Sequence, residues 1–96
     1  MTNDTRLTSL DWEDVRVFTV LARQRTLAAT AQSLQVSPTA VARRLERLES
    51  ALGYPLFTRS AGRFVLNRAG ADALADAAQM EMAACSLVQK RPAGGP

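Results

Sequence analysis

The stretch from Val36 to Ser50, VSPTAVARRLERLES, begins with Ser-Pro and holds Arg43, Arg44 and Arg47 close together. An arginine guanidinium stays charged at neutral pH and presents a planar fork of N–H donors. This fork matches a phosphate group or the edge of a guanine base. The same residues also fit an ordinary exposed helix, on which Arg43 pairs with Glu46 nearby. The rest of the chain must decide between these two interpretations.

The basic residues are concentrated in the middle of the chain. The net charge of the 96 residues is +3. From Arg23 to Arg68 there are eight arginines and two glutamates, a balance of +6, whereas the other residues carry four basic and seven acidic side chains, a balance of −3. A basic centre between acidic ends predicts a surface that binds a polyanion. A GC-rich genome would explain arginine in place of lysine, but it would not explain the clustering.

Enzymatic and metal chemistry find little support in the composition. The chain has no histidine and one cysteine, Cys85, which excludes an internal disulfide and a cysteine–histidine zinc site. Asp11, Glu13 and Asp14 cluster where a helix is expected to begin, and the helix macrodipole alone explains them. We therefore expect a protein that is not an enzyme and needs no cofactor. We also expect it to be cytoplasmic, since neither a signal peptide nor a membrane span is recognisable.

Four residues that commonly cap helices precede runs of helical periodicity. These N-caps are Asp11, Thr26, Ser37 and Asn67. The helices that they predict span residues 12–24, 27–34, 38–52 and 68 to about 88. The third helix has two further signals, Pro38 at its first position and Gly53 just after its end.

Between the third and fourth helices the apolar period becomes that of strands. Residues 56–59 and 63–66 are two short strand-like runs, and Ser60-Ala61-Gly62 between them predicts a tight hairpin. The third helix has one apolar face, made of Val41, Leu45, Leu48 and Leu52. Helix, helix, turn, helix, hairpin, helix is the order of a winged helix-turn-helix, a mainly α fold.

The side of the third helix opposite its apolar face is the candidate binding surface. In helix-turn-helix proteins the N-terminal part of this helix meets base edges in the major groove of DNA. Pro38, Thr39 and Ala40 are small enough to let the helix enter the groove. Arg43 can form a fork with guanine, and the methyl groups of Thr39, Ala40 and Ala42 can contact thymine.

Other residues are suited to the DNA backbone rather than to the bases. Helix N-termini favour phosphate, and so do arginines at the side of a recognition helix or on a hairpin. The residues expected to make such contacts are Thr26, Ser37, Arg44 and Arg47, and the hairpin that follows carries Arg59 and Arg63. The third helix, the turn before it, the helix caps and the basic hairpin all point to the same function. We therefore favour DNA binding over a charged surface helix.

From Trp12 to Gly70 the sequence resembles the N-terminal DNA-binding domain of LysR-type transcriptional regulators. The matching segments are FTVLA (18–22), TLAATAQSL (26–34), VSPTAVARRLERLE (36–49), LGYPLFTR (52–59) and LNRAG (66–70). Each segment alone is weak, but their order and spacing over some sixty residues are specific. Three positions depart from the family pattern: Ala42 replaces a usual serine, Arg25 a small residue, and Asn67 a threonine.

The resemblance implies a division of the chain and a partner. It implies a flexible N-terminus at 1–10, a DNA-binding winged helix-turn-helix at 11–66, a linker and dimerisation helix at 67–90, and a flexible link to an absent effector domain at 91–96. The linker helix would pair two subunits on an inverted repeat in promoter DNA, and a full-length protein would be a tetramer. The base-facing positions that it implies are Pro38, Thr39, Ala40, Ala42 and Arg43. It also implies that the wing, residues 57–66, lies on the backbone or in the minor groove, with Arg59 and Arg63 making the contacts.

Two other functions remain open on the sequence alone. Winged-helix domains of the molybdate-responsive and MarR types share the order of elements, although the segments after the third helix favour the LysR type. The chain could also be a protein–protein interaction module that keeps the fold without specific DNA binding. Retention of Arg43, Arg59 and Arg63 argues against that module.

Overall fold

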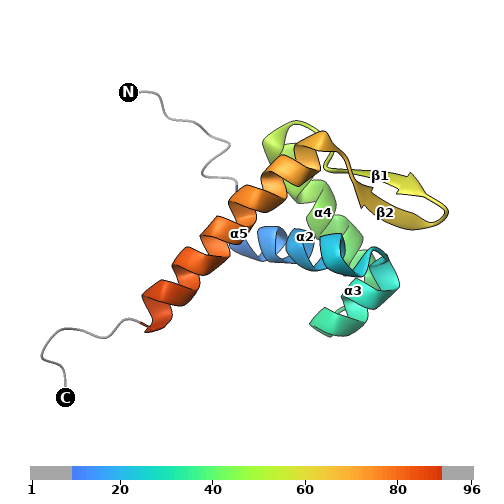
Figure 1. Ribbon diagram of the computed structural model, residues 1–96. Coiled ribbons are helices and arrows are strands. Elements are labelled where there is room, and N and C mark those ends of the chain that lie inside the picture. Colours follow the sequence, from blue (N-terminus) through green and yellow to red (C-terminus); the bar gives the residue numbers. More distant parts are fainter. Residues whose placement is uncertain (1–9, 90–96) are drawn as a thin grey trace, which may run out of the picture.

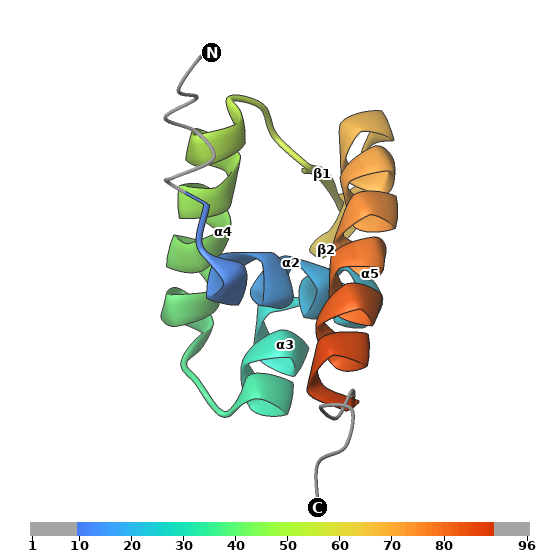
Figure 2. The ribbon, with the colours of Figure 1, turned by 90° about the vertical axis from the view of Figure 1, so that its left-hand side faces the viewer.

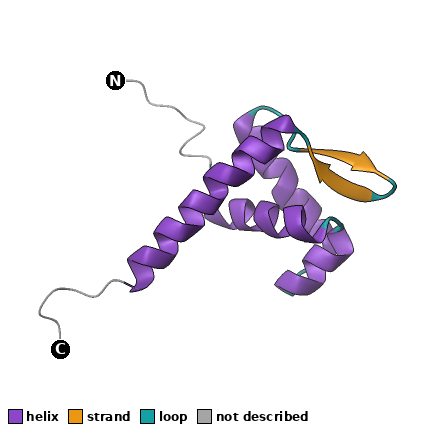
Figure 3. Ribbon diagram, in the orientation of Figure 1, coloured by secondary structure: helices purple, strands orange, loops and turns teal. Residues whose placement is uncertain are grey.

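The structure, a computed structural model, describes residues 10–89. Its elements are α2 (Trp12–Gln24), α3 (Leu27–Leu34), α4 (Pro38–Leu52), β1 (Phe57–Ser60), β2 (Arg63–Leu66) and α5 (Arg68–Gln89), as Figures 1 and 3 show. This order confirms the predicted winged helix-turn-helix. The predicted flexible segments at 1–9 and 91–96 lie outside the described residues. Leu10 was predicted to be flexible as well, but it packs against the core.

The predicted N-caps are confirmed by hydrogen bonds. A capping oxygen satisfies one of the N–H groups that lack a partner in the first turn of a helix. The bonds run from Glu13 N to Asp11 (2.8 Å), Ala29 N to Thr26 (3.1 Å), Ala40 N to Ser37 (3.1 Å) and Gly70 N to Asn67 (2.7 Å). Each helix therefore begins at the residue that the sequence indicated.

The first three helices end in residues with left-handed backbone conformation. Gly53 ends α4 with φ 89°, as predicted, and a glycine adopts this conformation without strain. Arg25 and Gln35 end α2 and α3 with φ 71° and 59°, where a Cβ atom makes the conformation unfavourable. At Arg25 the carbonyl oxygen also accepts a hydrogen bond of 2.7 Å from the N–H of Phe64. The end of α2 is thereby joined to the hairpin.

The core lies where α2 crosses the other helices. Figure 2 shows α2 between α4 and α5. Phe18, Leu21, Val41 and Leu56 are the largest apolar side chains that are fully buried. The predicted face of α4 is confirmed for Val41, Leu45 and Leu48, which are buried, whereas Leu52 at the end of the helix is only half-buried.

The hairpin pairs Phe57 with Leu66 and Ser60 with Arg63 in antiparallel register. Its first strand starts one residue later than predicted, because Leu56 is fully buried and its N–H donates to Glu49 at 2.8 Å. Phe57 holds the hairpin to the core, since its ring meets those of Phe18 and Phe64 edge-on at 5.6 Å. The hairpin is thus fixed at its base, while its tip projects from the helices (Figure 3).

The long helix α5 leaves the hairpin and crosses α2 (Figure 1). Gly70 makes the start of this course possible, since a Cβ atom there would overlap the carbonyl oxygen of Leu56. Further along, Ala77 is buried, and the Thr19 hydroxyl on α2 donates to Glu81 at 3.2 Å. Beyond this bond the helix leaves the core, and its side chains from Met82 to Gln89 are exposed.

Candidate nucleic-acid interface

The N-terminal end of α4 is an exposed surface of small residues. Pro38 and Thr39 are exposed, and Ala40 and Ala42 are partly buried. The helix is held in place because α2 and α3 both pack against its opposite side, with Val41 buried beneath. A narrow, rigid helix end of this kind has the shape that a major groove admits.

Arg43 lies one turn along on the same exposed side. It borders a shallow hollow with Glu46, Arg47, Ser50 and Ala51. Within residues 10–89 no carboxylate lies within 4.0 Å of its guanidinium, so the alternative pairing of Arg43 with Glu46 is not formed. Its N–H donors therefore face solvent and can form a fork with an external acceptor.

The two helix-capping hydroxyls that were predicted to hold phosphate lie at the starts of α3 and α4. Ser37 is exposed and Thr26 is half-buried. Each oxygen accepts a backbone N–H from its own helix, which leaves the hydroxyl hydrogen as a donor. The positive end of the helix dipole adds to the attraction for an anion at both places.

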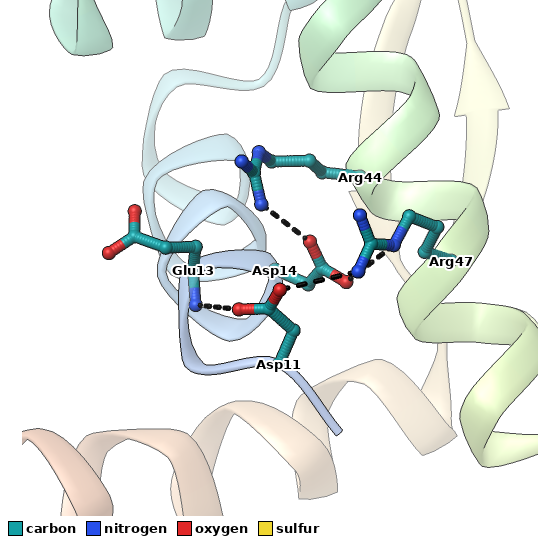
Figure 4. Close-up of polar contacts among 5 residues, drawn as sticks. All are labelled: Asp11, Glu13, Asp14, Arg44 and Arg47. Carbon is teal, nitrogen blue, oxygen red and sulfur yellow. Dashed lines mark hydrogen bonds and ion pairs between the residues drawn. The ribbon is translucent and has the colours of Figure 1, made fainter. Parts of the chain in front are cut away.

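Arg44 and Arg47 are placed differently from Arg43. Arg44 Nη1 lies 3.0 Å from Oδ1 of Asp14, and Arg47 Nε lies 3.3 Å from Oδ2 of the same carboxylate. Arg47 Nη2 also reaches Asp11 at 3.2 Å. Figure 4 shows these contacts between the start of α2 and the middle of α4. Both arginines thus face carboxylates of the same chain, and their predicted phosphate contacts remain a prediction.

Asp14 is a residue whose role the sequence did not reveal. Its side chain is only 3% exposed, so the explanation of the acidic cluster by the macrodipole alone was incomplete. Glu49 was missed as well, although its carboxylate joins the end of α4 to the start of the hairpin through Leu56. Each contact reaches a residue outside the helix that carries the carboxylate, and a periodic pattern in one segment cannot show it.

The wing arginines lie on the exposed hairpin. Arg59 stands opposite Phe64 in the register, and its guanidinium carbon lies 4.4 Å from the centre of that ring. This cation–π contact orients Arg59 and leaves the edges of its guanidinium free to donate. Arg63 is exposed beside the Ala61-Gly62 turn. Both predicted wing residues are therefore accessible to a ligand that lies along the hairpin.

The described residues offer little support for other kinds of site. Between residues 10 and 89, no group of three or more acidic or cysteine side chains is arranged to hold a metal ion. In the same range, none of the helices combines the length and apolar character that crossing a bilayer demands. The arrangement that stands out is an exposed helix end flanked by basic side chains on a helix-turn-helix and a wing.

This arrangement defines a winged helix-turn-helix protein. The model of the family described as "Bacterial regulatory helix-turn-helix protein, lysR family" matches residues 12–71. The chain belongs to this family, which is one of transcriptional regulators and not of enzymes. The predicted family is thus confirmed over the part of the chain that carried the resemblance.

Curated relatives resemble the chain over the same region. It is 38% identical over 61 residues to the HTH-type transcriptional activator IlvY of Salmonella typhimurium, a match that covers 64% of this chain and 21% of IlvY. It is 35% identical over 85 residues to the transcriptional regulator TfdS of Cupriavidus pinatubonensis, covering 88% of this chain and 29% of TfdS. The chain therefore spans between a fifth and a third of the length of these relatives.

A solved structure supports the fold. The crystal structure of a CbnR_DBD–DNA complex has a TM-score of 0.74 with the present structure at 32% identity, and the match covers 80% of this chain and 90% of that one. The described fold is thus that of a LysR-family DNA-binding domain.

Proposed function

We propose that this chain binds double-stranded promoter DNA in a sequence-specific manner as part of a bacterial transcriptional regulator. The observation that carries the proposal is the exposed N-terminal end of α4, where small side chains precede the exposed Arg43, which has no ion-pair partner among residues 10–89. The similarity to a protein solved as a DNA complex supports the same function. For a bacterial protein, this function implies a cytoplasmic location.

In the proposed complex α4 enters the major groove. Pro38, Thr39, Ala40 and Ala42 approach the bases closely, and Arg43 donates two hydrogen bonds to a guanine. Ala42 offers only a methyl group, so discrimination at its base pair depends on apolar contact with thymine. These contacts specify sequence, whereas contacts to phosphate fix the register of the protein.

The wing and the helix starts supply the backbone contacts. Arg59 and Arg63 reach phosphates or the minor groove beside the half-site that α4 reads. Thr26 and Ser37 hold phosphates with their hydroxyls and with the N-terminal N–H groups of their helices. Arg44 and Arg47 stand apart from this set because their guanidinium groups already face carboxylates.

The proposed functional unit is a homodimer joined through α5. In this proposal α5 is also the linker helix between the DNA-binding part and a following effector domain. The far end of α5 supports this, since Met82, Leu87 and Val88 are 72–83% exposed although apolar. Two subunits related by a twofold axis read an inverted repeat. The exposed apolar surface at the end of α5 is small, so the isolated dimer is weak and tightens on DNA. A full-length protein would form a tetramer.

The first test is a binding selection of this chain against a randomised duplex library at near-physiological salt. Enrichment of an inverted repeat with half-sites about one helical turn apart supports the proposal. Arg43→Glu should abolish this enrichment, and Gln79→Glu on exposed α5 serves as its control. Salt-sensitive binding without enrichment, or no binding, would instead favour an interaction module that has kept the fold.

A further inference from the structure

The three arginines of α4 do not have equal access to a ligand. Arg43 is exposed and has no ion-pair partner within residues 10–89. Arg44 and Arg47 lie on the side that faces α2, and their side chains are 37% and 55% exposed. Both could rotate toward a ligand if nothing held them, because arginine side chains are long and flexible.

What holds them is Asp14. Each oxygen of this carboxylate faces a different guanidinium, at 3.0 Å for Arg44 and 3.3 Å for Arg47. The side chain is 3% exposed, so water cannot replace these partners and a lost arginine would leave a buried charge unpaired. Asp11 adds a contact to Arg47 at 3.2 Å (Figure 4).

These contacts change the charge that α4 presents. The carboxylates of Asp11 and Asp14, at the start of α2, balance two guanidinium groups of α4. Of the charged side chains of α4, Arg43, Glu46 and Glu49 then remain, so the helix is less basic than its three arginines indicate. Each arginine that meets phosphate releases counterions, and this adds affinity for every DNA sequence alike. Arginines paired within the chain do not add that affinity.

We propose that Asp14 is a specificity-determining residue, which holds Arg44 and Arg47 away from phosphate and so limits binding to DNA of unrelated sequence. This inference rests on the proposed function and deepens it. A carboxylate accepts the same forked N–H donors as a phosphate, so Asp14 occupies these donors in place of the ligand. Discrimination is then left to Arg43 and the small residues before it.

The test measures binding of a random-sequence duplex as a function of salt concentration. In the wild-type protein, Arg44→Gln and Arg47→Gln should leave the slope of log K against log salt unchanged. Asp14→Asn should steepen that slope by about 0.9 for each arginine that reaches a phosphate. Adding Arg44→Gln to Asp14→Asn should remove the part that Arg44 supplies, an effect that a merely structural role for Asp14 would not produce.

Asp72→Asn is the matched control. It makes the same change of charge, but Asp72 is 75% exposed and its contact with Arg68 is 3.9 Å long, so the slope should not move. Circular dichroism checks that each variant is folded. If Asp14→Asn does not fold, Arg44→Gln and Arg47→Gln still test the inference. A slope that is shallower than the wild-type slope by about 0.9 in either variant would overturn it.

A second probe separates this inference from the proposed function. Heparin carries dense negative charge without a base sequence. Asp14→Asn should elute from a heparin column at higher salt than wild type and Asp72→Asn. Should this shift occur while no variant binds duplex DNA, the proposed function fails and the role of Asp14 toward polyanions stands. Equal elution of Asp14→Asn and Asp72→Asn would overturn the inference whether or not DNA is bound.

Discussion

The Asp14 carboxylate at the start of α2 lies 3.0 Å from the Arg44 guanidinium in the middle of α4. The two residues are 30 positions apart in the chain, and the pair joins two of the helices that make up the core. Because Asp14 is buried and Arg44 is not, the two partners contribute differently to stability. Loss of the arginine leaves a buried charge, whereas loss of the aspartate leaves an arginine that can turn to solvent.

Arg44→Ala is therefore expected to lower the free energy of unfolding by about 2 kcal/mol, because the Asp14 charge loses one of its two partners. Urea denaturation followed by circular dichroism measures the change. Arg68→Ala, which removes an exposed partner of Asp72, should change stability by less than about 0.5 kcal/mol. Equal effects of the two variants would show that the buried pair has no special weight.

Gly70→Ala is expected to cost about 3 kcal/mol, since its Cβ atom would overlap the backbone of Leu56 and a methyl group of Leu66. Gly62→Ala provides the comparison, because its surroundings are open and only its φ of +77° is unfavourable. That variant should cost about 1 kcal/mol. Thermal and urea unfolding measure the stability of both variants. A smaller loss of stability in Gly70→Ala than in Gly62→Ala would contradict the close packing of α5.

Arg25→Gly should stabilise the chain by about 1 kcal/mol, because a glycine adopts the φ of 71° at the end of α2 without strain. Arg23→Gly, two residues earlier and inside the helix, should destabilise it by about 1 kcal/mol. Urea unfolding gives both values. A loss of stability in both variants would mean that the Arg25 side chain makes a contact worth more than its backbone strain.

Arg43→Lys tests base reading separately from charge. Lysine keeps the positive charge but lacks the fork, so the ratio of specific to non-specific DNA affinity should fall about tenfold or more. The salt slope should stay the same, because the number of charges is unchanged. Titrations of the selected operator and of a random duplex measure both. Arg68→Lys is the control, and an unchanged ratio in Arg43→Lys would exclude a forked contact with a base.

Met82→Glu tests the proposed pairing through α5. The side chain is 72% exposed in the single chain, so a charge there should not affect folding. If it is buried between two subunits, the dimer dissociation constant should rise at least about tenfold, as expected from an apolar contact worth 1.5–3 kcal/mol. Sedimentation velocity measures this constant, with Gln32→Glu, at an exposed position on α3 rather than on α5, as control. An unaffected dimer would place the interface elsewhere.

The elements of this fold could be predicted because their signals are local. Ser37, Pro38 and Gly53 define both ends of α4 within one segment, and the caps of the other helices do the same. Leu56 shows where local signals stop. Its apolar side chain fits a strand, yet its burial and its bond to Glu49 keep it outside β1, because packing from other elements decides its conformation.

The candidate site was predictable in the same uneven way. The exposed positions of Thr39 and Arg43 follow from the helical period of α4 alone. The positions of the Arg44 and Arg47 side chains do not, since they depend on acids of α2 that are distant in the chain. A count of basic residues therefore overstates the attraction of the folded surface for a polyanion, because it includes arginines that are paired within the chain.

The hydrogen bond from Phe64 to Arg25 has a consequence for the length of the binding site. It fixes the hairpin to the turn before α3, so the distance between the wing and α4 stays constant. In the proposed complex, DNA that meets both must match this spacing by its own curvature. An operator with one base pair inserted between the two contacts would lose one of them, whereas an operator that bends easily there would keep both.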